Sequence, residues 1–170
     1  MRRNGVTMEI ERKYTIKELP GNLDSYEAHH IEQAYLNTEP VIRIRKEDEK
    51  YYLTYKGKGL LAREEYNLPL NAASYYHLRK KADGNVISKT RYLIPLEKPE
   101  FSVTLSAEEL NVPLKVELDI FDEPFRPLII AEVEFPTENA ANAFLPPSWL
   151  EKDVTFDYHY HNSYLSQPRK

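Results

Sequence analysis

Charged and polar side chains spaced two residues apart recur on one predicted strand after another, and this alternation limits the folds open to the chain. In an extended strand, successive side chains point to opposite faces, so residues two apart share a face. The run Glu9-Ile10-Glu11-Arg12-Lys13 places two carboxylates and an ammonium on one face. The pattern returns on further predicted strands at Arg43/Arg45, Thr54/Lys56, Arg63/Glu65/Asn67, Lys89/Arg91, Glu117/Asp119 and Glu132/Glu134. The chain is therefore predicted to be mainly β, with one charged face and one largely apolar face.

The sign of the charges differs from strand to strand, and this decides between two architectures. An open antiparallel sheet can turn its charged face to water, whereas a closed barrel encloses that face as a lumen and needs helices over its apolar outside. Acids pair with acids at 9/11, 117/119 and 132/134, and bases pair with bases at 43/45 and 89/91. Arginine forks suit phosphate oxygens, and paired carboxylates suit hard cations such as Mg²⁺ or Mn²⁺. The segregation favours a barrel whose charged lumen holds a polyanion beside metal ions.

Length and composition set the remaining bounds. The 170 residues predict a single domain over residues 8–170, preceded by a flexible leader over residues 1–7. The net charge of −4 gives no general attraction to nucleic acid. No apolar run approaches the ~18 residues of a membrane span. The absence of cysteine excludes disulfides and thiolate chemistry. We expect a cytoplasmic protein that binds neither nucleic acid nor membrane, with homodimer formation left open.

Strand and helix signals fill most of the chain. Runs rich in β-formers predict strands at 9–16, 32–36, 41–46, 51–56, 62–68, 86–95, 114–121 and 128–135. Capping residues predict helices from Asn71 to about Ala82 with a stop at Gly84, and from Thr137 to about Leu145. The tail from Asp153 to Leu165 is predicted to form a last short helix. The predicted class is α+β, mainly β, with a few helices packed outside the sheet.

Eight stretches in a fixed order make the chain resemble the CYTH domain, or triphosphate tunnel metalloenzyme, family. They are Glu9-Ile10-Glu11-Arg12-Lys13, Gln33-Ala34-Tyr35-Leu36, Arg43-Ile44-Arg45, Thr54-Tyr55-Lys56, Arg63-Glu64-Glu65-Tyr66, Lys89-Thr90-Arg91-Tyr92, Glu117-Leu118-Asp119 and Ala131-Glu132-Val133-Glu134-Phe135. The resemblance implies an eight-stranded antiparallel closed β-barrel. It also implies that the charged lumen binds a triphosphate group together with Mg²⁺ or Mn²⁺.

The resemblance further implies roles for individual side chains. The implied metal ligands are Glu9, Glu11, Asp119, Glu132 and Glu134, with Glu65 serving a second cation. The implied substrate contacts are Lys13, Arg43, Arg45, Lys56, Arg91 and, at a tunnel end, Tyr35, for which plain packing is the alternative. Lys89 and Arg91 are the implied catalytic pair. Lys89 is placed near the scissile phosphate, where the pair orients the attacking water or stabilises the leaving group.

Three features depart from the family pattern. Asn67 stands where relatives often carry a second glutamate after Glu65, which weakens the case for a second metal. Tyr158 and His159 stand where relatives often carry Lys or Arg. The connection from Leu96 to Pro113 is longer than in the shortest bacterial relatives, and it is predicted to form an extra hairpin or a lid over one tunnel mouth.

The leading hypothesis for function is a divalent-metal-dependent triphosphatase, an acid anhydride hydrolase, that acts on inorganic tripolyphosphate. The sequence shows no pocket for a base or a thiazole ring, which favours the inorganic substrate. The alternative enzymes are a nucleoside triphosphatase, an adenylyl cyclase of the class IV type and a thiamine triphosphatase. A polyphosphate binder without catalysis is the alternative from another class. None of the five histidines is predicted to bind metal.

Overall fold

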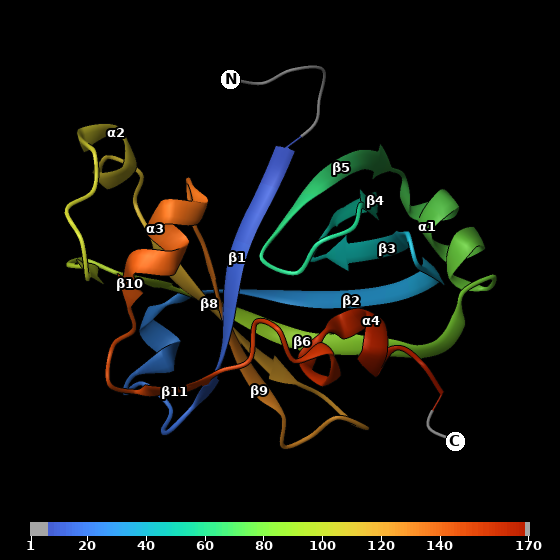
Figure 1. Ribbon diagram of the computed structural model, residues 1–170. Helices are drawn as coiled ribbons and strands as arrows, with labels where there is room; N and C mark the ends of the chain where they lie inside the picture. The colour runs from blue at the N-terminus through green and yellow to red at the C-terminus, as the bar shows by residue number, and fades with distance from the viewer. Residues whose placement is uncertain (1–6, 169–170) are drawn as a thin grey trace.

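The computed structural model describes residues 7–168, which form a closed sheet surrounded by short helices (Figure 1). The strands are β1 (Thr7–Ile16), β2 (Glu27–Thr38), β3 (Val41–Glu47), β4 (Lys50–Lys56), β5 (Ala62–Leu70), β6 (Asp83–Pro95), β7 (Glu100–Phe101), β8 (Lys115–Phe121), β9 (Ile129–Glu134), β10 (Phe144–Leu145) and β11 (Leu150–Asp153). The helices are η1 (Leu23–Ser25), α1 (Ala72–Arg79), α2 (Ala107–Leu110), α3 (Glu138–Ala143), η2 (Tyr158–Tyr160) and α4 (Asn162–Leu165). Within residues 7–168, no helix has both the length and the apolar character needed to cross a membrane.

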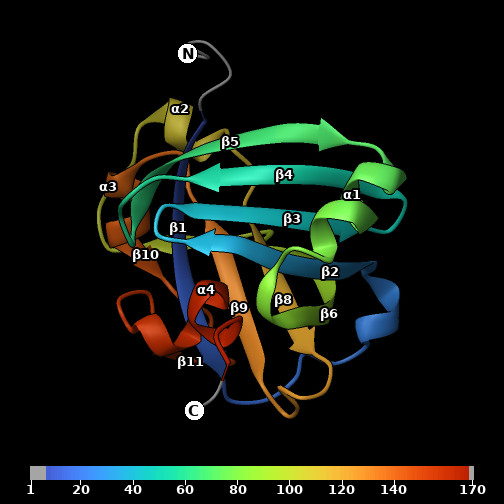
Figure 2. The same cartoon turned by 90° about the vertical axis from the view of Figure 1, so that its right-hand side faces the viewer.

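Eight strands close into an antiparallel barrel, which confirms the predicted fold. Their order is β1-β5-β4-β3-β2-β6-β8-β9, and β9 pairs again with β1 to complete the ring (Figure 2). β1 divides its length between two neighbours, since Thr7–Ile10 pairs with β5 and Glu11–Tyr14 pairs with β9. β11 adds a short outer strand to β1. The strand with the Glu9–Lys13 run is thus the seam of the barrel.

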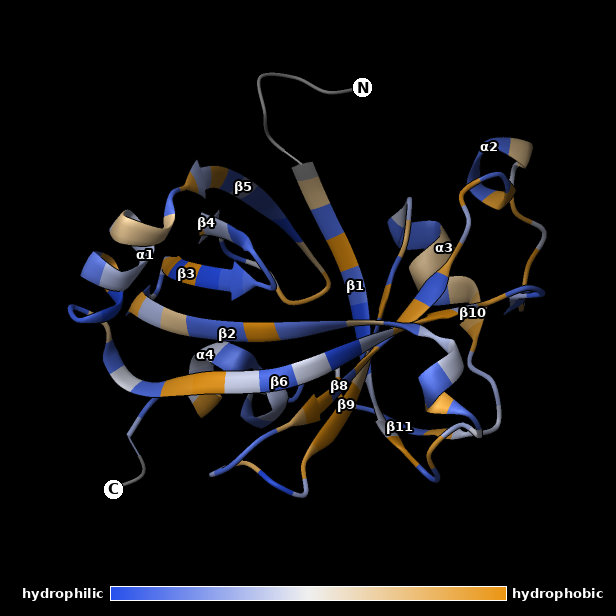
Figure 3. Ribbon diagram, turned by 180° about the vertical axis from the view of Figure 1, so that it is seen from behind, coloured by the Kyte–Doolittle hydropathy of each residue, from blue (hydrophilic) through white to orange (hydrophobic). Residues whose placement is uncertain are grey.

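Alternation along the strands puts charge inside the barrel and apolar side chains outside it. Figure 3 shows hydrophilic and hydrophobic residues alternating along β1. Outside β1, β8 and β9, buried residues such as Ile10, Val116 and Val133 pack with the alanines of α3. Outside β3, Ile44 packs against Tyr75 of α1. Helices therefore cover the apolar outer face, as predicted, and the interior is left for polar groups.

An apolar cluster nevertheless fills one end of the barrel interior. Tyr35, Ile87 and Phe121 are all buried there, and each shares a strand face with charged lumen residues. Tyr160 and Leu165, from near the chain end, pack against this cluster. The lumen is thus layered along its axis, with charge through most of its length and an apolar layer at one end.

The C-terminal segment, residues 154–168, crosses that apolar end. The backbone N–H of Val154 donates to the carbonyl oxygen of Lys13 in β1 at 2.8 Å. Farther along, the backbone N–H of Asn85 in β6 donates to the carbonyl oxygen of Ser166 at 2.6 Å. The segment is therefore tied to two strands that are not neighbours in the barrel.

The helices differ in part from the sequence prediction. Asn71 and Thr137 cap α1 and α3 as predicted, each accepting a backbone N–H. The prediction that α1 runs to about residue 82 and stops at Gly84 is wrong, because the helix ends at Arg79 and β6 begins at Asp83 to pair with β2. α3 also ends early, because the next two residues form β10 and pair with β7. The tail from Asp153 to Leu165 is not one helix, because it holds the last residue of β11 and two short helices, η2 and α4.

The connection from Leu96 to Pro113 lies against α3. Its strand β7 pairs with β10 and forms no hairpin of its own. Glu109 of α2 accepts a hydrogen bond from the Thr137 hydroxyl at the start of α3, at 2.5 Å. At the other end of the chain, Thr7 of the predicted leader already belongs to β1. The rest of that leader, residues 1–6, lies outside the described residues.

Gly84 allows the C-terminal segment to approach β6. Its φ is +72°, and a Cβ at this position would collide with the carbonyl oxygen of Ser166. We expect Gly84→Ala to lower the free energy of unfolding by about 1–3 kcal/mol, measured by chemical denaturation. Gly21→Ala is the control, because a Cβ there meets nothing within 4 Å. Equal stability of the two variants would show that the segment can shift without cost.

Candidate active site

The barrel encloses a cavity of about 890 Å³. Exposed side chains, among them Glu49, Lys50 and Lys115, line it at one end. At the apolar end, His161 and Ser163 of the C-terminal segment form part of the wall. The cavity is therefore open at a charged rim and covered at the opposite end.

Two arginines of β3 form a basic wall. Arg43 and Arg45 are buried and share the inner face because they lie two residues apart. Arg45 donates to Gln33 Oε1 at 2.9 and 3.1 Å and meets Glu47 only at 3.9 Å. Arg43 donates to Thr54 Oγ1 at 3.3 Å, and among the described residues its Nε has no partner. Burial and the neighbouring charge of Arg45 lower the pKa of Arg43. The two guanidinium groups are buried without a close carboxylate, so they are suited to bind an anion.

Carboxylates of β1 and β9 form an acidic wall. Glu11 lies directly opposite Glu134 in the β1–β9 ladder, an arrangement in which like charges repel. No described residue forms a hydrogen bond or ion pair with the Glu134 carboxylate. Partial burial and the charges of Glu9, Glu117 and Glu11 raise the pKa of Glu134 to about 7. Glu134 is therefore the carboxylate of this wall with most to gain from a hard cation, since Glu9 and Glu11 already have cationic partners.

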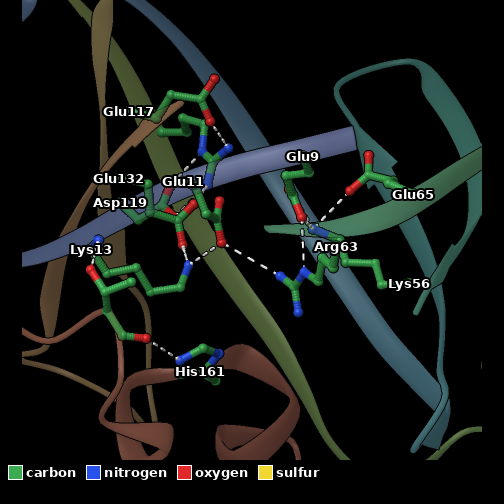
Figure 4. A network of polar contacts seen from close by, with 12 residues as sticks. Glu9, Glu11, Lys13, Lys56, Arg63, Glu65, Glu117, Asp119, Glu132 and His161 are labelled. Carbon is green, nitrogen blue, oxygen red and sulfur yellow. Dashed lines mark hydrogen bonds and ion pairs between the residues drawn. The ribbon is translucent and has the colours of Figure 1, made fainter. Parts of the chain in front are cut away.

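Lys56 neutralises two carboxylates near β5 (Figure 4). Its ammonium lies 2.6 Å from Glu9 and 2.8 Å from Glu65. Arg63 adds a second cation to Glu9 at 3.0 Å. Burial alone would raise the pKa of Glu65, but the charge of Lys56 and its hydrogen bond lower it to about 2. These carboxylates are thus ionised and paired.

Lys13 neutralises a second pair of carboxylates at the seam. Its ammonium lies 2.8 Å from Glu11 and also pairs with Glu132. Burial opposes the charged lysine, yet the two carboxylates raise its pKa. Among the described residues, no group of three or more His, Asp or Glu side chains is gathered tightly enough to hold a metal ion. The reason is visible in these pairs, since lysines and arginines separate the carboxylates that a cation would draw together.

Arg91 joins three carboxylates, two from β8 and one from β9. It grips Asp119 at 2.7 and 2.6 Å and pairs with Glu132 at 2.6 Å and with Glu117. Lys89 pairs with the same Asp119, and neither side chain has any exposed surface. Burial, aided by the charge of Arg91, lowers the pKa of Lys89 to about 8 although Asp119 opposes the shift.

The structure brings most of the predicted site residues to the cavity lining. Those that line it are Glu9, Glu11, Lys13, Tyr35, Arg43, Arg45, Lys56, Glu65, Arg91, Glu132 and Glu134. Tyr35 combines both readings, since it lines the cavity and packs in the apolar cluster. Lys89 and Asp119 are fully buried on the inner strand face and do not line the cavity, so their roles as catalytic lysine and metal ligand stay predictions.

Several lining residues were not assigned from the sequence. Arg63 and Glu117 carried the same spacing of two as their assigned neighbours, so that signal could have found them. His161 lies outside any periodic strand, and no sequence signal placed it at the cavity. Tyr158 and His159, which stand where relatives often carry Lys or Arg, do not replace a basic contact in the cavity. Both side chains are exposed, and neither lines the cavity.

Asn67 takes a defined place beside Glu65. Its side-chain amide donates to Glu65 Oε1 at 2.6 Å, and its Oδ1 accepts from the Thr54 hydroxyl at 2.6 Å. It therefore fixes the carboxylate that a glutamate at this position would repel.

Comparison with known proteins agrees with this geometry. The model of the CYTH domain matches residues 7–144. An inorganic triphosphatase of Nitrosomonas europaea is 32% identical over 161 residues, which cover 93% of this chain and 96% of the relative. An inorganic triphosphatase of Acetivibrio thermocellus is 30% identical over 166 residues, 92% of each chain. The crystal structure of the inorganic triphosphatase NE1496 superimposes with a TM-score of 0.66 at 30% identity and covers 95% of both chains. The chain belongs to the CYTH domain family.

Proposed function

We propose that this protein is a divalent-metal-dependent triphosphatase that hydrolyses inorganic tripolyphosphate. The observation that carries the proposal is one cavity with two walls of opposite charge. Arg43 and Arg45 offer positive charge without a close carboxylate, and the Glu11–Glu134 pair offers negative charge without a close cation at Glu134. The names of the relatives, both inorganic triphosphatases, support the choice of substrate.

The cations of the lumen supply binding and alignment. Guanidinium and ammonium groups hold phosphate oxygens by charge-assisted hydrogen bonds, and a chain held at several points is aligned for in-line attack by water. The residues proposed for this role are Lys13, Arg43, Arg45, Lys56 and Arg91. Lys13 and Lys56 must exchange a carboxylate for a phosphate when they do so.

Mg²⁺ or Mn²⁺ fits the acidic wall by charge and by ligand chemistry. The residues proposed to hold it are Glu9, Glu11, Glu132 and Glu134, with Glu65 toward a second cation. When bound, the ion neutralises negative charge on the phosphate oxygens. The hydrogen bond from Asn67 reduces the availability of Glu65 for a second cation. Asp119 is available as a ligand only when Lys89 and Arg91 release it.

The test is phosphate release from tripolyphosphate, ATP and thiamine triphosphate, with Mg²⁺, with Mn²⁺ and without metal. We expect release from tripolyphosphate only with metal. Tripolyphosphate with Mg²⁺ should also raise the melting temperature. At a hundredfold excess of ligand over Kd, the free energy of unfolding should increase by about 2.7 kcal/mol. Faster turnover of ATP or thiamine triphosphate would move the assignment to those enzymes. Cyclic nucleotide formation would indicate a cyclase, and stabilisation without turnover would indicate a binder.

A cytoplasmic location and a homodimer stay predictions.

Arg43→Ala should weaken substrate binding more than it slows the chemical step. The arginine contacts phosphate in the ground state and in the transition state alike, so its loss is expected to raise KM with a smaller change in kcat. Lys46→Ala is the matched control, because Lys46 lies on the same strand and does not line the cavity. Steady-state kinetics of both variants decide the matter, and an unchanged KM for Arg43→Ala would remove Arg43 from the site.

A further inference from the structure

The proposed hydrolysis needs a group that accepts a proton from water. Carboxylates of the acidic wall, such as Glu134, can accept one, but they are the proposed ligands of the cation. Protonated lysine and arginine only donate, and Lys89 does not line the cavity. Two histidines line the cavity, His29 and His161. Both ring nitrogens of His29 face carboxylates, Asp48 at 2.6 Å and Glu27 at 3.1 Å. His161 is therefore the lining histidine with a nitrogen to spare.

One hydrogen bond fixes the tautomer of His161. Its Nε2 lies 3.0 Å from the carbonyl oxygen of Thr155. A carbonyl oxygen only accepts, so the proton of the neutral ring must reside on Nε2. Thr155 is itself 1% exposed and held in place, since Lys13 N–H donates to its hydroxyl at 3.0 Å and its own N–H donates to Asp153 at 2.9 Å. Nδ1 of His161 is left with a lone pair and no partner among the described residues.

The surroundings of His161 keep the ring neutral. The side chain is only 6% exposed and reaches the cavity from the C-terminal segment, below Lys13 in the view of Figure 4. Burial and the positive charges of Lys13 and Arg63 lower its pKa. A neutral ring whose free nitrogen is an acceptor cannot bond to a phosphate oxygen, which is also an acceptor. The partner that suits it is a water molecule.

The position of His161 at the covered end also suits the direction of attack. If a triphosphate enters end-on through the rim, one terminal phosphate would lie toward the apolar end and the other two phosphates toward the rim. In-line displacement requires the nucleophile on the side opposite the leaving group. A water between His161 and the terminal phosphate meets that requirement.

We propose that His161 is the general base for this hydrolysis, an inference that rests on the proposed function. Nδ1 takes a proton from the water as the water oxygen forms its bond to the terminal phosphorus. The bond from that phosphorus to the bridging oxygen breaks, and its electron pair leaves with diphosphate. The imidazolium then returns its proton to solvent after the products depart.

The decisive variant is His161→Gln. The glutamine amide nitrogen can reach the position of Nε2 and keep the hydrogen bond to Thr155, but it brings no basic group. We expect kcat to fall on the order of 10²–10⁴-fold, with KM and the melting temperature close to those of the wild-type protein. His159→Gln is the matched control, because His159 lies two residues away, is exposed and pairs with Asp157 at 2.7 Å. Its kcat should not change.

Each outcome bears on one claim. If the wild-type protein releases phosphate from tripolyphosphate and His161→Gln does so equally fast, His161 is not the base and the proposed function stands. If the wild-type protein releases none from any triphosphate, the function falls and the role of His161 falls with it. Should His161→Gln fold poorly, ¹⁵N spectra of histidine-labelled wild-type protein replace it. At neutral pH we expect the His161 proton on Nε2, and a proton on Nδ1 would overturn the proposal.

Discussion

Glu134→Gln is expected to abolish metal-dependent phosphate release while leaving the barrel folded. The substitution removes one negative charge from the wall that faces the proposed cation, and it keeps the size of the side chain. A bound cation supplies several kcal/mol of stabilisation to the transition state, so kcat should fall on the order of a hundredfold or more. Isothermal titration with Mn²⁺ should show weaker binding alongside the kinetic loss. Glu138→Gln, at an exposed position of α3, is the control and should behave as wild type.

The same variant should change the pH dependence of stability in metal-free buffer. Because the pKa of Glu134 is raised from 4.5 to about 7, the folded protein binds a proton between these values that the unfolded chain does not. Stability at this residue is therefore present below pH 4.5 and is lost as the pH rises toward 7. Glu134→Gln should show a shallower loss across this window in thermal melts. A slope identical to that of wild type would mean that Glu134 is not crowded by the neighbouring carboxylates.

Lys89→Ala is expected to reduce both stability and turnover. Its ammonium and Asp119 have no exposed side-chain surface, and removal of one partner from such a buried pair costs about 3–5 kcal/mol. Asp119 also holds Arg91, which does line the cavity, so the loss of Lys89 disturbs a lining residue even if Lys89 never touches substrate. We expect kcat to fall on the order of a hundredfold, comparable to the loss of one preorganised donor.

Lys89→Arg separates two explanations for that effect. The Lys89 ammonium lies 5.1 Å from the ring centre of Phe121 in a fully buried site, so a larger guanidinium should fit poorly. Arginine also gives up its proton far less readily than lysine. Near-full activity of Lys89→Arg would mean that Lys89 acts only as a fixed positive charge, and its assignment as a catalytic lysine should then be withdrawn. Lys81→Ala, at an exposed position, is the control.

The barrel could be predicted because its signal is local and repeated. A spacing of two fixes the face of each side chain, so Arg43 with Arg45 and Glu132 with Glu134 were assigned to the lumen correctly. The same rule does not predict how deeply a side chain is buried or which other side chains it pairs with. Lys89 and Asp119 share an inner face with lining residues, yet they pair with each other, are fully buried and do not line the cavity. Their enclosure depends on contacts between strands that are far apart in the sequence.

The end of the chain shows a second limit of sequence reasoning. His161 comes to the cavity because the C-terminal segment is tied to β1 at one point and to β6 at another. Neither contact follows from a periodic pattern in the segment itself. Gly84 was predicted to stop a helix. In the structure, its lack of a side chain allows the carbonyl oxygen of Ser166 to approach β6. Tertiary contacts of this kind override local propensity.

The shared partners of Lys13 and Lys56 have a thermodynamic consequence. Each lysine holds two carboxylates, and these carboxylates are the proposed ligands of the cation. A cation that draws the carboxylates away frees both ammonium groups for phosphate, and a phosphate that draws the ammonium groups away frees the carboxylates for a cation. Each ligand thus removes the competitor of the other. By linkage, the factor by which Mg²⁺ tightens tripolyphosphate must equal the factor by which tripolyphosphate tightens Mg²⁺. The internal ion pairs therefore make the binding of the metal and of the triphosphate cooperative, so the barrel binds the two together more tightly than either ion alone.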